Sequence, residues 1–489
     1  MLHLVSGLRR AAELPRWVIG RMRTMSMPRR PARSEVDERP RTPSEGTGPG
    51  RGQGNSGARA SRPPPPAASA VALGATVPAP ARARRSTASP DLPGAAATIP
   101  RLAIALVAAC PFPYPRGTPV RILRMAEALA QRGHRVHVVT YHLGNDDPAE
   151  GVLIHRTRPL RSYAKVAPGP SWQKLLVMDP LLLRLLAAVI REQAIQIVHA
   201  HHYEGLMVGV INRRRHGPPL IYDAHTMLAS ELPSYRVGLP NALKRALGGR
   251  IDAWLPGLAD HIVTVTDTIR DRLVDRHGLA PERVTTVPNG IELEHFAAVG
   301  PACVRPGEPR RIVFAGNLAG YQRVDLLLEA FALVRHERPA ARLVLAADGD
   351  FAPYAAQAAA LGVQDAIEVV DGGSFAGLPA VLGRAEIAVN PRTQCDGMPV
   401  KLLNYMAAGM PTVSCAGAAP GVVHGETGWV VPNDDAPAFA RGIVALLDDP
   451  GRARRLGAAA RSHVAHNYRW PVQAERLEEL YLRLLRTRA

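Results

Sequence analysis

The chain has 489 residues, of which 46% are hydrophobic, and a net charge of +18. This length accommodates two or three domains, and the absence of an apolar run of about 18 residues argues against a membrane-spanning helix. The four cysteines are scattered without a C-x-x-C pair, which excludes a disulfide framework and a cysteine zinc site and is typical of a reducing compartment.

The positive charge is concentrated at one end of the chain. Residues 1–100 hold 16 arginines, no lysine and six acids, which gives +10 of the +18. The segment is also rich in Pro, Ala, Gly and Ser, a composition that cannot bury a core. We therefore expect a disordered basic extension over residues 1–98, and we expect no nucleic-acid partner, because the charge reports the extension and not a folded basic surface.

The first 25 residues are open to three interpretations. They could form a weak basic amphipathic helix on a membrane surface, belong to the disordered extension, or precede a start site assigned too early. Pro15 interrupts the helical pattern and favours the last two. A secretory signal is not indicated, since no apolar region precedes a small-residue cleavage site.

Short apolar strands alternate with helical patterns from residue 101 onward. Such alternation predicts a parallel sheet covered by helices on both faces, here an N-terminal Rossmann-like domain over residues 99–296. The strands that we expect lie at 101–110, 134–141, 195–200, 219–225, 261–266 and 283–290.

The same alternation restarts after a Gly- and Pro-rich linker at 297–310. It predicts a second Rossmann-like domain over 311–468, followed by a C-terminal helix within 469–489. In such sheets ligands bind outside the carboxyl ends of the strands, so two domains of this kind leave a cleft between them. The strands that we expect in the second domain lie at 311–316, 341–349, 366–373, 385–392 and 411–417.

The first strand leads through Gly117 and Thr118 into a helix that has Pro119 in its first turn. A helix that begins after a glycine turn offers free N–H groups to an anion. The motif is neither G-x-G-x-x-G nor a Walker loop. An ordinary strand-to-helix turn therefore explains it as well as an anion site does.

Lys401 is one of only four lysines in the chain, beside 56 arginines. It lies in the first turn of a helix that we expect to begin at Met398–Pro399, where the helix dipole disfavours a cation unless an anion binds. Arg392 at the end of the preceding strand, Gly397, and Asn404 one turn further on favour a site for phosphate and sugar hydroxyls. The alternative is a solvated surface lysine.

Histidines cluster in the first domain. His199, His201 and His202 resemble metal ligands, but no cysteine or acidic cluster accompanies them, and we expect a polar loop at the end of a strand, without a metal. His225 follows a strand directly and should face the cleft, although a lone histidine is often structural.

Six stretches occur in the order found in a known family: PFPYPRGTPVRILRMAEALAQRGHRVHVVTY, IVHAHHYEG, IYDAHT, VTTVPNGIELEHF, FAGNLAGYQRVDLLLEAF and DGMPVKLLNYMAAGMPTVSCAGAAPGVVHGETGWVVPNDD. With them the chain resembles the family 4 retaining glycosyltransferases of the GT-B fold over residues 101–489. The last stretch is the most specific.

The resemblance implies a hexosyltransferase without a cofactor or metal. It also implies that residues 99–296 form the acceptor domain, that 311–468 form the nucleotide-sugar donor domain, and that the helix within 469–489 crosses back to the first domain. The enzyme would move a sugar from a nucleotide diphosphate sugar to a glycan or lipid-linked acceptor in cell-envelope, exopolysaccharide or glycolipid synthesis. The expected catalytic residues are His225, which lines the reacting carbon, and Lys401 and Arg392, which stabilise the leaving diphosphate. The expected donor-binding residues are Gly117, Thr118, Gly316, Asn317, Gln322, Arg323, Gly349, Asp396, Gly397, Met398, Pro399 and Asn404.

The chain departs from the family pattern at the donor site. Asp396 and Asn404 stand where two glutamates are common, and we expect them to bind sugar and ribose hydroxyls respectively. Asn317, Gln322 and Arg323 stand where Arg, Lys and Gly are usual, so the usual pair of phosphate cations is missing from that loop. Arg392 and Lys401 are the expected replacement.

These departures leave two alternatives open. The chain could bind a sugar nucleotide or glycan without turnover, or it could be a nucleotide-sugar 2-epimerase. The basic segment at 239–255, with Lys244, Arg245 and Arg250, predicts weak association with anionic membranes, so we expect a cytoplasmic protein, peripheral on the inner face of the membrane.

Overall fold

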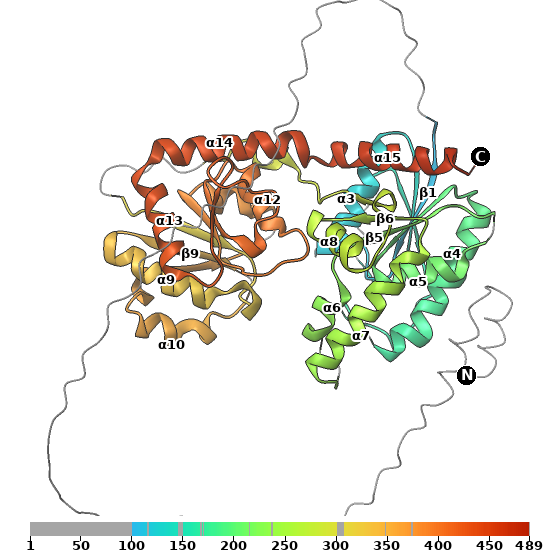
Figure 1. Cartoon of the computed structure of the whole chain (residues 1–489), viewed down its shortest axis with the longest axis horizontal. Coiled ribbons are helices and arrows are strands. Elements are labelled where there is room, and N and C mark those ends of the chain that lie inside the picture. Colours follow the sequence, from blue (N-terminus) through green and yellow to red (C-terminus); the bar gives the residue numbers. More distant parts are fainter. Residues whose placement is uncertain are drawn as a thin grey trace, which may run out of the picture. The chain divides into compact units, whose positions relative to one another are not determined.

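A computed structural model describes residues 100–488 except 115–116, 145–149, 167–168, 170, 215, 236–237, 301–307, 348 and 373–374. The extension expected over 1–98 and the middle of the expected linker lie outside the described residues. The described residues form two parallel sheets with helices packed on them (Figure 1). The predicted fold class, two doubly wound Rossmann-like domains, is confirmed.

The first lobe is built on a seven-stranded sheet in the order β3-β2-β1-β4-β5-β6-β7. Its central strands are short apolar runs such as AIALVA in β1, buried on both faces as expected for a parallel sheet. The strands are β1 (Ala103–Ala108), β2 (Arg135–Thr140), β3 (Val152–Arg156), β4 (Ile197–His201), β5 (Leu220–Ala224), β6 (His261–Thr264) and β7 (Val284–Thr286).

In the described residues of this lobe, six α-helices connect the strands. The first of them, α3, begins at Gly117 and ends before Gly133, whose φ of +93° closes the helix. The helices are α3 (Gly117–Gln131), α4 (Asp179–Glu192), α5 (His202–Asn212), α6 (Leu228–Glu231), α7 (Asn241–Trp254) and α8 (Asp267–Asp271).

The second lobe is built on a six-stranded sheet in the order β10-β9-β8-β11-β12-β13. Its strands are β8 (Arg311–Ala315), β9 (Arg342–Ala347), β10 (Ile367–Asp371), β11 (Ile387–Asn390), β12 (Thr412–Cys415) and β13 (Trp429–Val431). Its helices are α9 (Val324–Glu337), α10 (Ala352–Ala360), α11 (Leu378–Leu382), α12 (Val400–Ala407), α13 (Ala436–Asp448) and α14 (Pro450–Asn467). None of the helices in the described part of the chain is long and apolar enough to cross a membrane.

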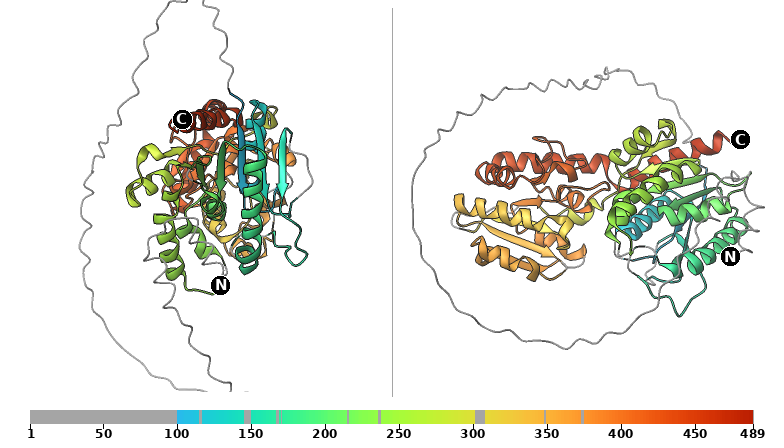
Figure 2. Two further views of the ribbon diagram at one scale, coloured as in Figure 1. Left: turned by 90° about the vertical axis from the view of Figure 1, so that its right-hand side faces the viewer. Right: turned by 60° about the horizontal axis from the view of Figure 1, so that its bottom comes forward.

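The last helix, α15 (Trp470–Arg486), packs on the first lobe, whereas α14 before it lies along the second (Figures 1 and 2). Trp470 and Tyr481 join the apolar core beneath α3, and Trp470 lies so close to Gly290 that a Cβ there would approach its ring to 2.3 Å. Glu478, also buried, pairs with His134 at 3.2 Å and with Arg132. The C-terminal helix therefore contributes to the core of the first lobe.

We expect Trp470→Ala to lower the free energy of unfolding by about 3–5 kcal/mol, because it removes a large side chain that is only 7% exposed and leaves a cavity. Trp254→Ala is the matched control, since Trp254 is 49% exposed and should change stability by less than about 0.5 kcal/mol. Chemical denaturation of the two variants measures the difference. Equal small effects would show that α15 is not part of the first-lobe core.

Candidate functional site

The predicted helix start at Met398–Pro399 corresponds to α12, whose N-cap residue is Pro399. Gly409, with φ +68°, follows the C-terminal end of this helix. Lys401 is the second residue of this helix. Its Nζ donates to Gln322 Oε1 at 2.9 Å and lies 3.9 Å from the centre of the Phe314 ring. The ammonium therefore lies at the carboxyl end of β8, beside the loop that begins at Gly316.

The loop after β8 passes close to the Lys401 ammonium. Gly316 has φ +143°, and a Cβ added there would lie 2.9 Å from Lys401 Nζ, so a side chain at 316 would displace the lysine. The Tyr405 hydroxyl accepts from the backbone N–H of Ala315 at 2.7 Å and ties the same loop to α12. Lys401 itself binds Gln322, the position where the usual lysine of the family is expected from the sequence, and the replacement of that loop cation by Lys401 stays a prediction.

Arg392 lies on the same side of the second sheet. Its guanidinium is 4.8 Å from the centre of the Tyr321 ring, and its Nε donates to the carbonyl of Gln394 at 2.7 Å. Within the described part of the chain, neither Arg392 nor Lys401 forms an ion pair. Burial, followed by the positive charge of Arg392, lowers the pKa of Lys401 to about 7. A negative ligand would reverse this effect and restore the charge.

The loop before α12 is attached to the first lobe. The Asp396 carboxylate pairs with Arg272 at 2.6 Å and accepts from the Ser230 hydroxyl, while the Asp396 carbonyl accepts from Thr266 Oγ1 at 2.6 Å. A Cβ on Gly397 would lie 3.0 Å from the carbonyl oxygen of His225. The loop before α12 and the residue that follows β5 therefore face each other directly.

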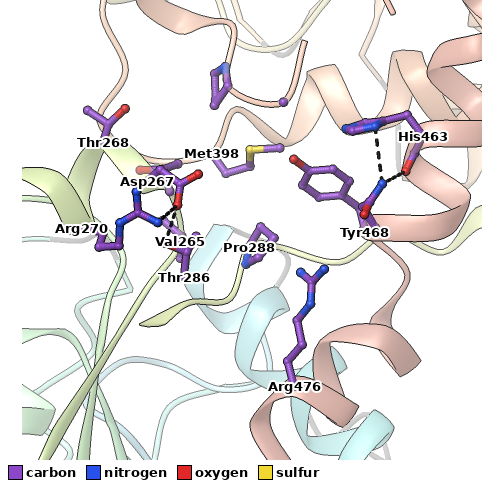
Figure 3. Close-up of a pocket in the computed structure, with 14 residues that line it drawn as sticks. Val265, Asp267, Thr268, Arg270, Thr286, Pro288, Met398, His463, Tyr468 and Arg476 are labelled. Carbon is purple, nitrogen blue, oxygen red and sulfur yellow. Dashed lines mark hydrogen bonds and ion pairs between the residues drawn. The ribbon is translucent and has the colours of Figure 1, made fainter. Parts of the chain in front are cut away.

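A cavity of about 530 Å³ adjoins this attachment (Figure 3). Thr266 and Met398 line it from the two lobes, Tyr468 lines it from the connection between α14 and α15, and Arg476 lines it from α15. The close-up shows Arg270 paired with Asp267 on one side and Arg476 on the other. The cavity lies beside the Asp396 contact and not at Lys401, so it adjoins the junction of the lobes.

A buried polar cluster occupies the carboxyl end of the first sheet. Asp223 on β5 accepts from Arg121 Nε at 3.1 Å and from its Nη2 at 3.3 Å. Although burial alone would raise it, Arg121 and the surrounding histidines hold the pKa of Asp223 well below its usual range. His201 Nδ1 lies 3.1 Å from His225 Nε2, and Thr118 Oγ1 lies 3.4 Å from His225 Nδ1. The structure thus brings together His225 and Thr118, two of the predicted site residues.

The expectation that His199 and His201 belong to a polar loop is wrong. Both lie in β4 with no exposed surface, and their rings stack at 4.9 Å beside Asp223. The three residues have the composition of a metal site, and their nitrogen and oxygen atoms lie within 4.8 Å of one another. Arg121 already supplies the positive charge that the carboxylate requires. The absence of a metal from the reaction stays a prediction.

The remaining predicted residues divide into two groups. Arg323 adopts the left-handed conformation, with φ +57°, that the usual glycine would supply, but its guanidinium pairs with Asp325 and Asp434. The donor-binding roles of Arg323 and Asp396, whose side chains have protein partners, stay predictions. The residues that lie along the mouths of the two sheets are Gly117 at the start of α3, Asn317 and Gln322 in the β8 loop, Gly349 after β9, and Met398, Pro399 and Asn404 around α12.

Sequence reasoning missed Arg121, Asp223 and Asn289, which surround the histidines. A signal was present. His199, His201, Asp223 and His225 are spaced by two in neighbouring parallel strands, and His201 is the register partner of Asp223. Side chains spaced by two lie on one face of a strand, so the four should have been placed together.

Two Rossmann-like lobes whose strand ends face a common junction define the GT-B class of glycosyltransferases, and solved structures share the fold. Sucrose-phosphate synthase from Thermosynechococcus elongatus has a TM-score of 0.65 at 20% identity, over 79% of this chain and 100% of that chain. Anabaena HepE in complex with UDP has a TM-score of 0.59 at 15% identity, over 78% and 99%.

Sequence comparison gives the family. Residues 115–295 match the family described as Glycosyltransferase Family 4, and residues 309–449 match Glycosyl transferases group 1. The chain belongs to family 4 of the GT-B glycosyltransferases, as its motifs predicted.

Two relatives are named D-inositol 3-phosphate glycosyltransferase. The protein of Thermobispora bispora is 28% identical over 397 residues, which are 76% of this chain and 90% of the relative. The protein of Kineococcus radiotolerans is 27% identical over 440 residues, which are 80% and 97% of the two chains.

The lowered pKa of Lys401 makes stability depend on pH. Between pH 7 and its ordinary value of 10.5, the unfolded chain binds a proton at this lysine that the folded chain does not, so stability rises with pH across that window. We expect Lys401→Met to remove up to about 1.4 kcal/mol per pH unit from that slope. Denaturation of both proteins between pH 7 and 10 measures the difference, and parallel slopes would show that the lysine is solvated.

Proposed function

We propose that the chain transfers a hexose from a nucleotide diphosphate sugar to an acceptor hydroxyl, with retention at the anomeric carbon and without a metal ion. The observation that carries the proposal is the position of the Lys401 ammonium. It lies at the start of a helix, 2.9 Å from Gln322, and has no carboxylate partner in the described part of the chain. A diphosphate would supply the missing negative charge.

The proposed reaction separates charge along the donor. The bond from the anomeric carbon to the diphosphate oxygen breaks, and a bond from that carbon to the acceptor oxygen forms. Lys401, Arg392 and the free N–H groups of α12 stabilise the negative charge that develops on the leaving diphosphate. A diphosphate oxygen accepts the proton of the acceptor hydroxyl, since both groups lie on one face of the sugar.

Asn404 supports a ribose subsite beside the diphosphate. Its side chain is 8% exposed, and its Oδ1 has no hydrogen-bond partner in the described part of the chain. A buried acceptor without a partner costs free energy that a ligand hydroxyl would recover. Asn404 thus suits the ribose role proposed for it, in place of the usual glutamate.

The acceptor is proposed from chemistry and from the relatives. A glycan or lipid-linked acceptor would place the reaction in cell-envelope, exopolysaccharide or glycolipid synthesis. The name of the relatives adds a cyclitol phosphate as a second acceptor to test. Incubation of labelled donors with each acceptor, and with none, distinguishes transfer from the alternatives, because epimerisation alone or binding without turnover would contradict the transferase.

We expect Lys401→Met to weaken binding of a nucleoside diphosphate by about tenfold to a hundredfold, since one charge-assisted contact is lost, and to leave nucleoside monophosphate binding nearly unchanged. The double variant Lys401→Met/Gln322→Lys should recover part of the loss, because Gln322 contacts Lys401 Nζ at 2.9 Å and an ammonium at position 322 would lie near the original one.

Isothermal titration with both nucleotides measures this effect, and Lys165→Met controls for the loss of a lysine elsewhere. Diphosphate binding that is unaffected in Lys401→Met would place the donor site elsewhere. A double variant no better than the single one would show that the ammonium acts through packing and not through charge.

We also propose that the first lobe binds anionic membranes, although not as the sequence suggested. Lys244 was expected to face the lipid, but it is 5% exposed and its Nζ donates to the carbonyl of Tyr235 at 2.7 Å. Lys244 is buried because the chain around Tyr235, which precedes α7, packs on it. Large apolar side chains are exposed instead, namely Trp172, Leu175 and Leu176 before α4, and Leu243, Leu247 and Trp254 on α7 beside the exposed Arg245 and Arg250.

The apolar segments before α4 and on α7 lie near each other. A Cβ on Gly169 would touch the Tyr235 ring at 2.7 Å, and Tyr235 in turn binds Lys244 of α7. Exposed apolar side chains bordered by arginine are typical of surfaces that lie on anionic lipid. A lipid-linked acceptor would then reach the first lobe from the membrane.

We expect Trp172→Ser/Leu175→Ser to reduce recovery with anionic vesicles in a flotation assay by about tenfold, since two large apolar side chains no longer insert. Leu153→Ser/Val369→Ser removes two apolar side chains that are also exposed, at sheet edges, and serves as the control. Equal recovery of the two variants, or no recovery of the wild type, would contradict membrane binding by this surface.

A further inference from the structure

The buried carboxylate of Asp223 sets a direction for the hydrogen bonds around it. It is 0% exposed, and Arg121 binds both of its oxygens, so it is ionised and accepts hydrogen bonds without donating any. The Nδ1 of His201 lies 3.4 Å from Asp223 Oδ2. A lone pair on that nitrogen would face a negative oxygen with no water between them.

His201 is neutral, because burial lowers its pKa well below the usual range despite the nearby Asp223. A neutral imidazole carries one hydrogen, and the carboxylate requires it on Nδ1. The other nitrogen, Nε2, has no partner in the described part of the chain. An unpaired lone pair there is also less costly than a buried N–H without an acceptor.

This tautomer determines that of the next histidine. His201 Nδ1 and His225 Nε2 are 3.1 Å apart, so only one of the two nitrogens can carry a hydrogen. If His201 carries it, His225 Nε2 accepts. Burial also lowers the pKa of His225 well below its usual range, although Asp223 opposes this, so the ring is neutral and its hydrogen is on Nδ1.

We propose that Asp223 and His201 are positioning residues that fix His225 as the Nδ1–H tautomer, so that His225 donates a hydrogen bond at the sugar site and does not take up the proton of the acceptor. The Nδ1–H points to Thr118 Oγ1 at 3.4 Å, a long contact at the start of α3, and the Thr118 hydroxyl donates onward to His202 Nε2 at 2.8 Å. A donor-sugar hydroxyl that replaced the long contact would receive the same hydrogen.

The tautomer follows from the first lobe alone, whereas its use in sugar binding rests on the proposed transfer. The inference also restricts the mechanism. A histidine with Nε2 occupied by His201 and a hydrogen on Nδ1 has no lone pair free for the acceptor hydroxyl. The proton therefore goes to the leaving diphosphate.

Long-range ¹H–¹⁵N correlation spectra of the full chain labelled in histidine test the assignment, with and without UDP. His225→Gln identifies the His225 signals among the 17 histidines by difference. The expected pattern is that of an Nδ1–H imidazole. His201→Phe should convert it to Nε2–H, since Asp223 Oδ1 is then the nearest acceptor, 3.8 Å away. His201→Asn, which keeps an N–H at this place, should retain the original pattern.

The control is His199→Phe, because His199 also lies 3.4 Å from Asp223 but does not contact His225. Its His225 pattern should not change. In kinetics with a donor sugar, His201→Phe should lower kcat by about fivefold to tenfold, the loss of one hydrogen bond, and His201→Asn should restore most of it.

A wild-type Nε2–H pattern, or equal spectra of His201→Phe and His201→Asn, would overturn the inference whatever the activity. The expected spectra together with no transfer from any donor would leave the tautomer assignment standing and would contradict the proposed function instead.

Discussion

The ion pair between Asp223 and Arg121 is the interaction on which the polar cluster at the carboxyl end of the first sheet depends. Burial of a carboxylate away from water costs free energy. A bidentate guanidinium offsets this cost only if every other neighbour of the carboxylate donates a hydrogen bond or is a neutral ring. Arg121 meets this condition from α3, and its remaining donors bind Asn289 at 3.1 Å and the carbonyl of Val287 at 2.9 Å. One arginine therefore joins α3 to β5 and to the segment after β7, beneath the histidines of the cluster.

The two lobes differ in how their charges are balanced. The first lobe neutralises its buried charge internally, and α15 adds a further bond, because His199 Nδ1 lies 2.6 Å from the Tyr481 hydroxyl. At its candidate site the second lobe has Lys401 and Arg392, neither of which has a carboxylate partner in the described part of the chain. A neutral surface opposite an uncompensated positive one would suit the proposed transfer, in which a negative charge develops on the leaving diphosphate.

Much of the fold could be predicted from the sequence, and the site only in part. Buried parallel strands read as apolar runs, which gave most of both sheets, whereas the edge strands Val152–Arg156 and Trp429–Val431 are short and half-buried and gave no such run. Lys401 stood out because the chain uses lysine so rarely. The partners of Asp223 and Asp396 could not be derived, because pairs such as Arg121–Asp223 and Arg272–Asp396 join residues more than 100 positions apart and depend on the packing of whole lobes.

The hydrogen bond between Lys401 and Gln322 constrains the order in which these two positions could have been exchanged during evolution. The usual family pattern has lysine at the position of Gln322, whose Oε1 lies 2.9 Å from Lys401 Nζ, so a chain with lysine at both positions would hold two ammoniums close together. At an effective dielectric constant of about 20, two unit charges about 4 Å apart repel each other by about 4 kcal/mol. An ancestor with both lysines would have folded poorly without bound nucleotide, so the exchange passes more easily through a chain that had already lost one of them. Each lineage would then keep one ammonium, carried either by the loop after β8 or by α12, and a search for the ancestral lysine by its sequence position alone would overlook its substitute.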